Sequence, residues 1–134
     1  MLGILELCFV IVQFIVVGFL IFFWIYFLLV ERKDPEKSQV YIAHESSFPL
    51  ADLVWLAPCL LIAAIGLITK QKFGVFFLIV SGSVQIFLGL IDLSFNLQQG
   101  QYKGNKSDMI LNIVIQGYCF IFGVLFLIYG FLNF

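Results

Sequence analysis

The sequence predicts an all-α protein, a transmembrane four-helix bundle with up-down topology. Of its 134 residues, 63% are hydrophobic and only 11% are charged, whereas charged residues make up about 25% of an average soluble domain. The apolar residues form four continuous runs, each near the roughly 20 residues that a helix needs to cross a bilayer. Barrel strands would be shorter and would alternate in polarity, so the runs favour helices.

The first run extends from about Leu2 to Val30. It lacks a basic start and a small-residue cleavage site, so we expect a membrane helix and not a cleaved signal peptide. Its middle, FLIFFWIYFLL, is rich in phenylalanine and is expected to face lipid. The run ends at ERKDPEKSQ, which cannot continue a buried helix. There Asp34 and Pro35 predict a short surface helix with Asp34 as its N-cap.

Three further runs complete a single transmembrane domain over residues 1–134: about Leu50–Thr69, Phe73–Leu97 and Met109–Asn133. Ser46 or Ser47 is expected to cap the second helix, with Pro49 in its first turn. The KQK connection that follows is short enough to force an antiparallel hairpin whose two helices are in contact.

The last connection, QQGQYKGNKSD, joins the third helix to the fourth. Gly100 and Gly104 are stop signals for the third helix, because glycine is common just past a helix C-terminus. Ser107 is expected to cap the fourth helix.

Small and polar residues follow one face of the third helix. Their spacing of three or four residues predicts a narrow stripe that consists of Ser81, Gln85, Gly89, Asp92, Asn96 and Gln99. In lipid this face must turn inward, because polar side chains need partners and small residues let helices approach closely. The fourth helix carries a matching set with Asn112 and Gln116, so we expect Asp92 to meet one of these two amides.

The depth of the polar residues along their helices predicts where a candidate site lies. Consecutive helices run in opposite directions, so most of the polar residues are predicted to lie at one end of the bundle, around a half-buried polar pocket. The candidate ligand-binding residues are Asp52, Asp92, Asn96, Asn112 and Gln116 at that end, with Gln85 nearer mid-depth. An ionisable residue within a membrane helix is a functional candidate by default, because burying its charge is costly.

Both carboxylates also have a structural interpretation. Asp52 falls in the first turn of its helix, where it can accept from free backbone N–H groups and complement the helix dipole. Asp92 lies near a helix C-terminus, where the dipole disfavours an anion, so it is the stronger functional candidate. It can equally fix the helix register through interhelical hydrogen bonds. The sequence leaves these alternatives open.

Other reactive residues predict no metal, cofactor or catalytic centre. Cys8, Cys59 and Cys119 are widely separated and are expected to be small packing residues. His44 is the sole histidine and lacks the further ligands of a metal site. The sequence has no catalytic triad or phosphate loop, and a net charge of −1 without a basic stripe excludes nucleic acid as a partner.

The stretch FPLADLVW, followed by AAIGL and by KFGVFFLIVSGSVQIFLGLIDLSFNLQQGQY, resembles small bacterial four-helix membrane proteins of uncharacterised function. The resemblance covers Phe48–Tyr102 and centres on Asp52 together with Asp92 and Asn96. It implies a multi-pass protein of the inner membrane with a shared polar end, and no activity. The layout is also loosely similar to that of DoxX-like and EXPERA-domain proteins, in architecture alone.

We therefore expect a membrane protein without enzymatic activity that binds a lipid-like molecule, or a partner membrane protein, at the polar end near Asp92. A partner here includes a second copy of the chain. One alternative is transport of protons or cations in an oligomer, with Asp52 and Asp92 as the sites. Another is a membrane-embedded enzyme that uses the two carboxylates as acid and base.

Overall fold

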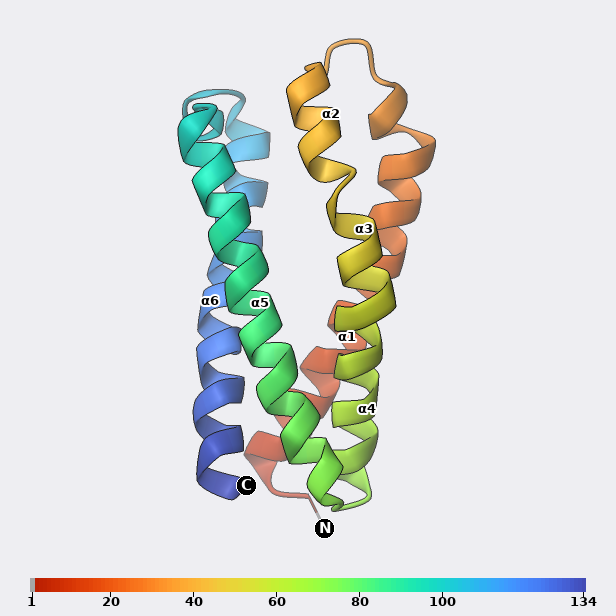
Figure 1. Ribbon diagram of the computed structural model, residues 1–134, viewed down its shortest axis with the longest axis vertical. Coiled ribbons are helices and arrows are strands. Elements are labelled where there is room, and N and C mark those ends of the chain that lie inside the picture. Colours follow the sequence, from red (N-terminus) through yellow and green to blue (C-terminus); the bar gives the residue numbers. More distant parts are fainter. Residues whose placement is uncertain (1) are drawn as a thin grey trace. The chain divides into compact units, whose positions relative to one another are not determined.

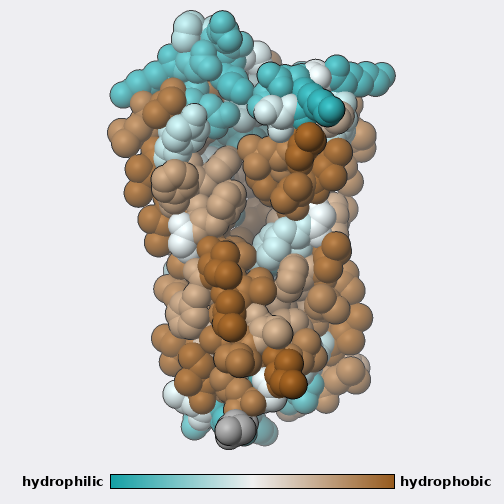
Figure 2. All heavy atoms as spheres, turned by 180° about the vertical axis from the view of Figure 1, so that it is seen from behind, coloured by the Kyte–Doolittle hydropathy of each residue, from teal (hydrophilic) through white to brown (hydrophobic). Residues whose placement is uncertain are grey.

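The computed structural model describes residues 2–134, and in this part of the chain it is helical, without any strand (Figure 1). The all-α helical bundle is confirmed. Hydrophobic residues cover the helices along most of their length, and hydrophilic residues gather at helix ends and connections (Figure 2). Four segments are long and apolar enough to cross a membrane, which indicates a membrane protein: Ile4–Lys33, Gln39–Ile68, Lys72–Gln98 and Lys106–Asn133.

The chain divides into two compact units, Met1–Phe77 and Leu78–Phe134. Each is described here by itself. Helix α5 (Lys72–Gln98) belongs to both, because it begins in the first unit and continues through the second. The single domain over residues 1–134 stays a prediction.

Helix α1 runs from Ile4 to Leu29, close to the predicted first span. It packs against α4 (Ala57–Ile68) in the first unit. The prediction that its Phe-rich middle faces lipid is wrong for two aromatic residues, because Trp24 and Phe27 are buried while Phe22 is exposed. Composition cannot separate the faces of a helix that is apolar all round, whereas packing against a neighbour does.

A short helix, α2 (Gln39–Glu45), follows the first span, but Asp34 is not its N-cap. Asp34 accepts from the backbone N–H of Glu36 at 2.9 Å and closes a local turn instead. The cap of α2 is Ser38, whose hydroxyl accepts from the backbone N–H of Tyr41 at 3.1 Å. Asp34 closes its own turn first because its short side chain reaches the N–H two residues on.

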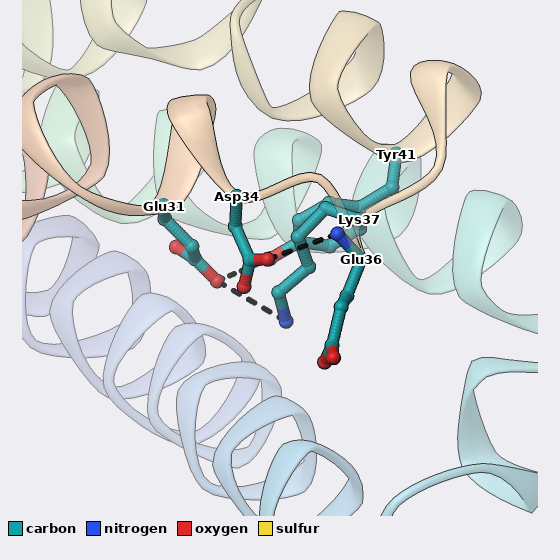
Figure 3. A network of polar contacts seen from close by, with 5 residues as sticks. All are labelled: Glu31, Asp34, Glu36, Lys37 and Tyr41. Atoms are coloured by element: carbon teal, nitrogen blue, oxygen red, sulfur yellow. Dashed lines mark hydrogen bonds and ion pairs between the residues drawn. The ribbon is translucent and has the colours of Figure 1, made fainter.

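A polar network ties the end of the first span to α2 (Figure 3). The Tyr41 hydroxyl donates to the Glu31 carboxylate at 3.1 Å, and the Lys37 ammonium lies 3.6 Å from the same oxygen. Lys37 also lies 5.2 Å from the centre of the Tyr41 ring. Because the three groups share one site, ordering one side chain lowers the entropic cost of ordering the others.

The second span is not one regular helix. After α2, which opens the segment Gln39–Ile68, it consists of α3 (Phe48–Ala51), with Pro49 in its first turn as predicted, a π-helical turn at Asp52–Leu56, and α4. Neither predicted serine caps it through its side chain: Ser47 precedes α3, but its hydroxyl donates to the Ala43 carbonyl at 3.0 Å.

The π-helical turn has a cause in the sequence. Pro58 has no N–H, and its ring would clash with the carbonyl of Val54 in a regular helix. The chain widens before it, so that the Ala57 N–H donates to the carbonyl of Asp52, five residues back. Such single wide turns within α-helices are frequent at functional sites.

The predicted hairpin between the second and third spans is confirmed. The Gln71 N–H donates to the Gly66 carbonyl at 2.8 Å and the Lys70 N–H to Leu67 at 3.2 Å, with Lys70 at a left-handed φ of 55°. These are the two bonds of a Schellman motif, which ends a helix and reverses the chain. A Cβ atom on Gly66 would lie 2.2 Å from the Cα of Gly74, so glycine at both positions allows the backbones to touch.

In the second unit, α5 and α6 (Lys106–Asn133) run antiparallel (Figure 1). They approach closely at two glycines of α5. A Cβ atom on Gly82 would lie 2.6 Å from the Gly123 carbonyl oxygen, and one on Gly89 would lie 3.1 Å from the Cβ of Cys119. The α5 stripe is accordingly buried at Ser81, Gln85, Gly89 and Asn96, half-buried at Asp92 and exposed at Gln99.

The connection between α5 and α6 agrees with the sequence at one residue and differs at another. Gly100 has a left-handed φ of 65°, as expected of a helix stop. The prediction that Ser107 caps α6 is wrong: Asn105 is the N-cap, and its side-chain oxygen accepts from the backbone N–H of Ser107 at 2.9 Å. Asparagine and serine cap about equally well, so sequence alone does not choose between neighbours.

Replacing Asn105 by alanine is expected to lower the free energy of unfolding by about 1 kcal/mol, because the N–H of Ser107 loses its acceptor. Ser107→Ala, two residues away, keeps that N–H and is expected to change stability by less than about 0.5 kcal/mol. Thermal unfolding of both variants in detergent micelles measures the difference. The reverse ranking of the two variants would restore Ser107 as the cap.

Candidate functional site

Asp92 is the centre of a hydrogen-bonded cluster in the second unit. Its Oδ2 atom accepts from the Gln116 amide nitrogen at 3.0 Å and from the Asn96 amide nitrogen at 3.2 Å. Asn96 lies one turn further along α5, and Gln116 comes from α6. Asp92 is half-buried, whereas both amides are buried. Asp92, Asn96 and Gln116 are called the Asp92 cluster below.

Tyr102, in the connection between the two helices, extends the Asp92 cluster. Its hydroxyl donates to the Gln116 side-chain oxygen. The carboxylate decides which way the amide points, because an ionised carboxylate accepts only. Gln116 therefore turns its NH2 group to Asp92 and its oxygen to the Tyr102 hydroxyl. Sequence reasoning did not select Tyr102, although an aromatic hydroxyl between two loop glycines, Gly100 and Gly104, was a signal for it.

Of the two amides expected to meet Asp92, Gln116 does so. The structure gives no hydrogen bond between Asn112 and Asp92 in residues 2–134, and Asn112 is half-buried. On a helix, residues 112 and 116 lie on the same face, one turn apart. Gln116 lies one turn further from the start of α6 than Asn112 does. Its side chain is longer than that of asparagine, and it reaches Asp92.

Asp52, in the first unit, has a different partner from the one its sequence position indicated. Its carboxylate is buried and accepts from the indole N–H of Trp24 at 2.8 Å. It does not begin a helix: the four residues of α3 precede it, and it opens the π-helical turn. The expected role as a first-turn cap is therefore replaced by a tertiary hydrogen bond between the first and second spans.

The predicted residues thus belong to two arrangements. Asp92, Asn96 and Gln116 come together in one unit, and Asp52 pairs with Trp24 in the other. The convergence of all six candidates on one pocket stays a prediction. Gln85 is fully buried in α5, where the Tyr118 hydroxyl lies near it.

The Asp92 cluster combines groups that accept and donate hydrogen bonds. It presents a carboxylate, which accepts hydrogen bonds and attracts positive charge. Two amides hold this carboxylate, and the phenol of Tyr102 holds one of them, the Gln116 amide. Cys119, one turn along α6 from Gln116, is half-buried and belongs to no disulfide. The groups of the cluster can accept hydrogen bonds from a donor or attract a cation.

No family model, curated protein or solved structure matches the chain.

Proposed function

We propose that this protein binds an amphipathic, lipid-like molecule in the membrane through the Asp92 cluster. The carrying observation is the carboxylate of Asp92, half-buried in a membrane helix and held by the amides of Asn96 and Gln116. A charge within a membrane helix is costly and is generally associated with function. We further propose a bacterial inner membrane, since the layout is similar to that of small bacterial four-helix membrane proteins.

Depth supports a head group as the bound part of the ligand. Asp92 lies six residues before the end of α5 at Gln98, which is about 9 Å along a helix axis. A group there is near the membrane surface, where the polar heads of lipids lie. The ligand's apolar body would then lie along the hydrophobic surfaces of α5 and α6.

The chemistry of the cluster specifies the head group. Asp92 accepts and does not donate when ionised, so its ligand must offer N–H or O–H donors, and a cationic amine fits best. Gln116 holds the carboxylate from α6, and Tyr102 in turn holds the Gln116 amide from the loop side. Because the chain's own side chains already hold the carboxylate, little ordering is needed on binding, which favours affinity.

Replacing Asp92 by asparagine is expected to reduce the copurifying lipid about tenfold or more, because a hydrogen bond to a charged group contributes about 1.5–3 kcal/mol. Asparagine keeps the size and one acceptor oxygen, so we expect folding to persist. The measurement is mass spectrometry of lipids retained by the purified full-length protein, with thermal unfolding as the control for folding.

Asp108→Asn is the matched control, because it removes the same charge from the first turn of α6 outside the Asp92 cluster. It is expected to retain wild-type lipid. Equal lipid recovery from wild type and Asp92→Asn, together with poor expression of Asp92→Leu, would mean that Asp92 only fixes the helix register. Recovery of a partner membrane protein that depends on Asp92, with no lipid, would replace the lipid by that partner.

A further inference from the structure

Deeper along the same pair of helices, two polar side chains are buried without hydrogen-bond partners among the described residues. Gln85 on α5 is fully buried, and neither its amide nitrogen nor its amide oxygen is bonded. The hydroxyl of Tyr118 on α6 is buried and unbonded as well. The Gln85 amide lies near enough to the Tyr118 hydroxyl to interact with it, but the geometry does not reach that of a formed hydrogen bond.

The position of Gln85 makes this arrangement costly. It lies 13 positions from each end of α5, at Lys72 and at Gln98, and so at the centre of a membrane-spanning segment. Nearly all buried polar groups in proteins have a partner, and in the bilayer core there is no bulk water to supply one. A glutamine kept here therefore indicates a partner from outside the chain.

The donors and acceptors present specify that partner. An amide offers N–H donors and an acceptor oxygen, and a phenol offers one donor and an acceptor. A hydroxyl group both donates and accepts, so it can bond Gln85 and Tyr118 at once. A charged group is disfavoured at this depth. The Tyr118 ring is held in place by stacking on Phe122, with 5.2 Å between ring centroids.

We propose that Gln85 and Tyr118 form a site for a hydroxyl group inside the membrane, supplied by water or by an apolar alcohol. The site is independent of the proposed ligand of Asp92, which lies seven residues further along α5, about 10 Å away along the helix axis. Failure of one proposal leaves the other intact, because the tests use different variants and different probes.

The test uses the full-length protein in phosphatidylcholine nanodiscs, with ¹⁵N-labelled glutamine side chains observed by NMR. The Gln85 signals are assigned by their loss in Gln85→Leu. We expect a cross peak between the Gln85 NH2 group and water if water occupies the site. If an alcohol does, we expect 1-dodecanol to shift these signals, dodecane to leave them unchanged, and Tyr118→Phe to weaken the dodecanol response at least threefold. Absence of both the water cross peak and a dodecanol-specific shift overturns the proposal.

The Tm of Gln85→Leu is a second measurement, and the sign of its change distinguishes an empty site from an occupied one. Leucine is close to glutamine in size, so Gln85→Leu removes an unsatisfied amide if the site is empty, and the Tm then stays level or rises. An occupied site predicts a fall in Tm by a few degrees, while Gln99→Leu, at an exposed position, leaves the Tm unchanged.

Another side chain of the protein could be the partner in place of a hydroxyl, and a double-mutant cycle tests this. Gln13 on α1 is the residue to combine with Gln85, because its amide is also buried without a described partner. The hydroxyl site predicts that the effects of Gln13→Leu and Gln85→Leu on Tm add. Equal falls in the two single variants, with no further fall in the double variant, overturn it.

Discussion

Replacing Gly66 by alanine is expected to destabilise the protein by about 2 kcal/mol, because overpacking a close contact typically costs 1–3 kcal/mol. The added Cβ atom would lie 2.2 Å from the Cα and 2.4 Å from the backbone nitrogen of Gly74. Backbone atoms cannot rotate away as a flexible side chain can, so α4 and α5 must separate at their hairpin. Thermal or denaturant unfolding in detergent micelles measures the loss.

Gly18→Ala is the matched control, since it makes the same change in α1 where a Cβ atom would meet nothing within 4 Å. There the lower backbone entropy of alanine in the unfolded chain is the main effect, and a gain of about 0.5–1 kcal/mol is expected. The two variants should thus move stability in opposite directions. Similar shifts in both would show that the Gly66–Gly74 contact does not limit the packing of α4 on α5.

The same contact predicts how a second substitution behaves. Gly74→Ala alone should cost about as much as Gly66→Ala, because its Cβ atom would lie 2.4 Å from the carbonyl carbon of Gly66. Once the first alanine has moved the helices apart, the Cβ atom of the second alanine has room and adds little further strain. The double variant is therefore expected to lose clearly less than the sum of the single losses.

The helices could be predicted from the sequence because hydropathy and length decide them. Each predicted span overlaps a helical segment that is long and apolar enough to cross a membrane. The α5 stripe was predictable for the same kind of reason, since helical period alone fixes which residues share a face. From that face the meeting of Asp92 with Asn112 or Gln116 followed, because a polar side chain in lipid needs a partner on the next helix. Which of the two amides it meets, Gln116, came only from the structure.

Contacts between distant residues were not predictable in this way. Trp24 and Asp52 are 28 positions apart, and in a segment that is aromatic throughout nothing marks one ring as a hydrogen-bond donor to a later span. The π-helical turn depends on how the chain relieves the clash at Pro58, which composition does not specify. The hydrogen bond from Tyr102 to Gln116 depends on the path of the connection between α5 and α6, and the sequence of that short connection does not specify its path.

Trp24→Phe is expected to lower the free energy of unfolding by about 2 kcal/mol, because depriving a buried acceptor of its donor costs about 1–3 kcal/mol. The indole N–H of Trp24 donates to the buried carboxylate of Asp52 at 2.8 Å, and phenylalanine removes that donor while keeping an aromatic ring. The protein's other tryptophan supplies the control. Trp55 is 54% exposed, so Trp55→Phe should leave stability nearly unchanged.

A double-mutant cycle separates the hydrogen bond from the loss of packing. Asp52→Leu alone leaves the buried indole N–H of Trp24 without its acceptor, and Trp24→Phe alone leaves the carboxylate without this donor. With both replaced, neither desolvated group remains, so the double variant should be more stable than the sum of the single losses predicts, by about 1–2 kcal/mol. Strict additivity would mean that the two residues contribute separately. A coupling of the expected size makes this pair the main polar link between the first and second spans, and the reason that a carboxylate is kept at the π-helical turn.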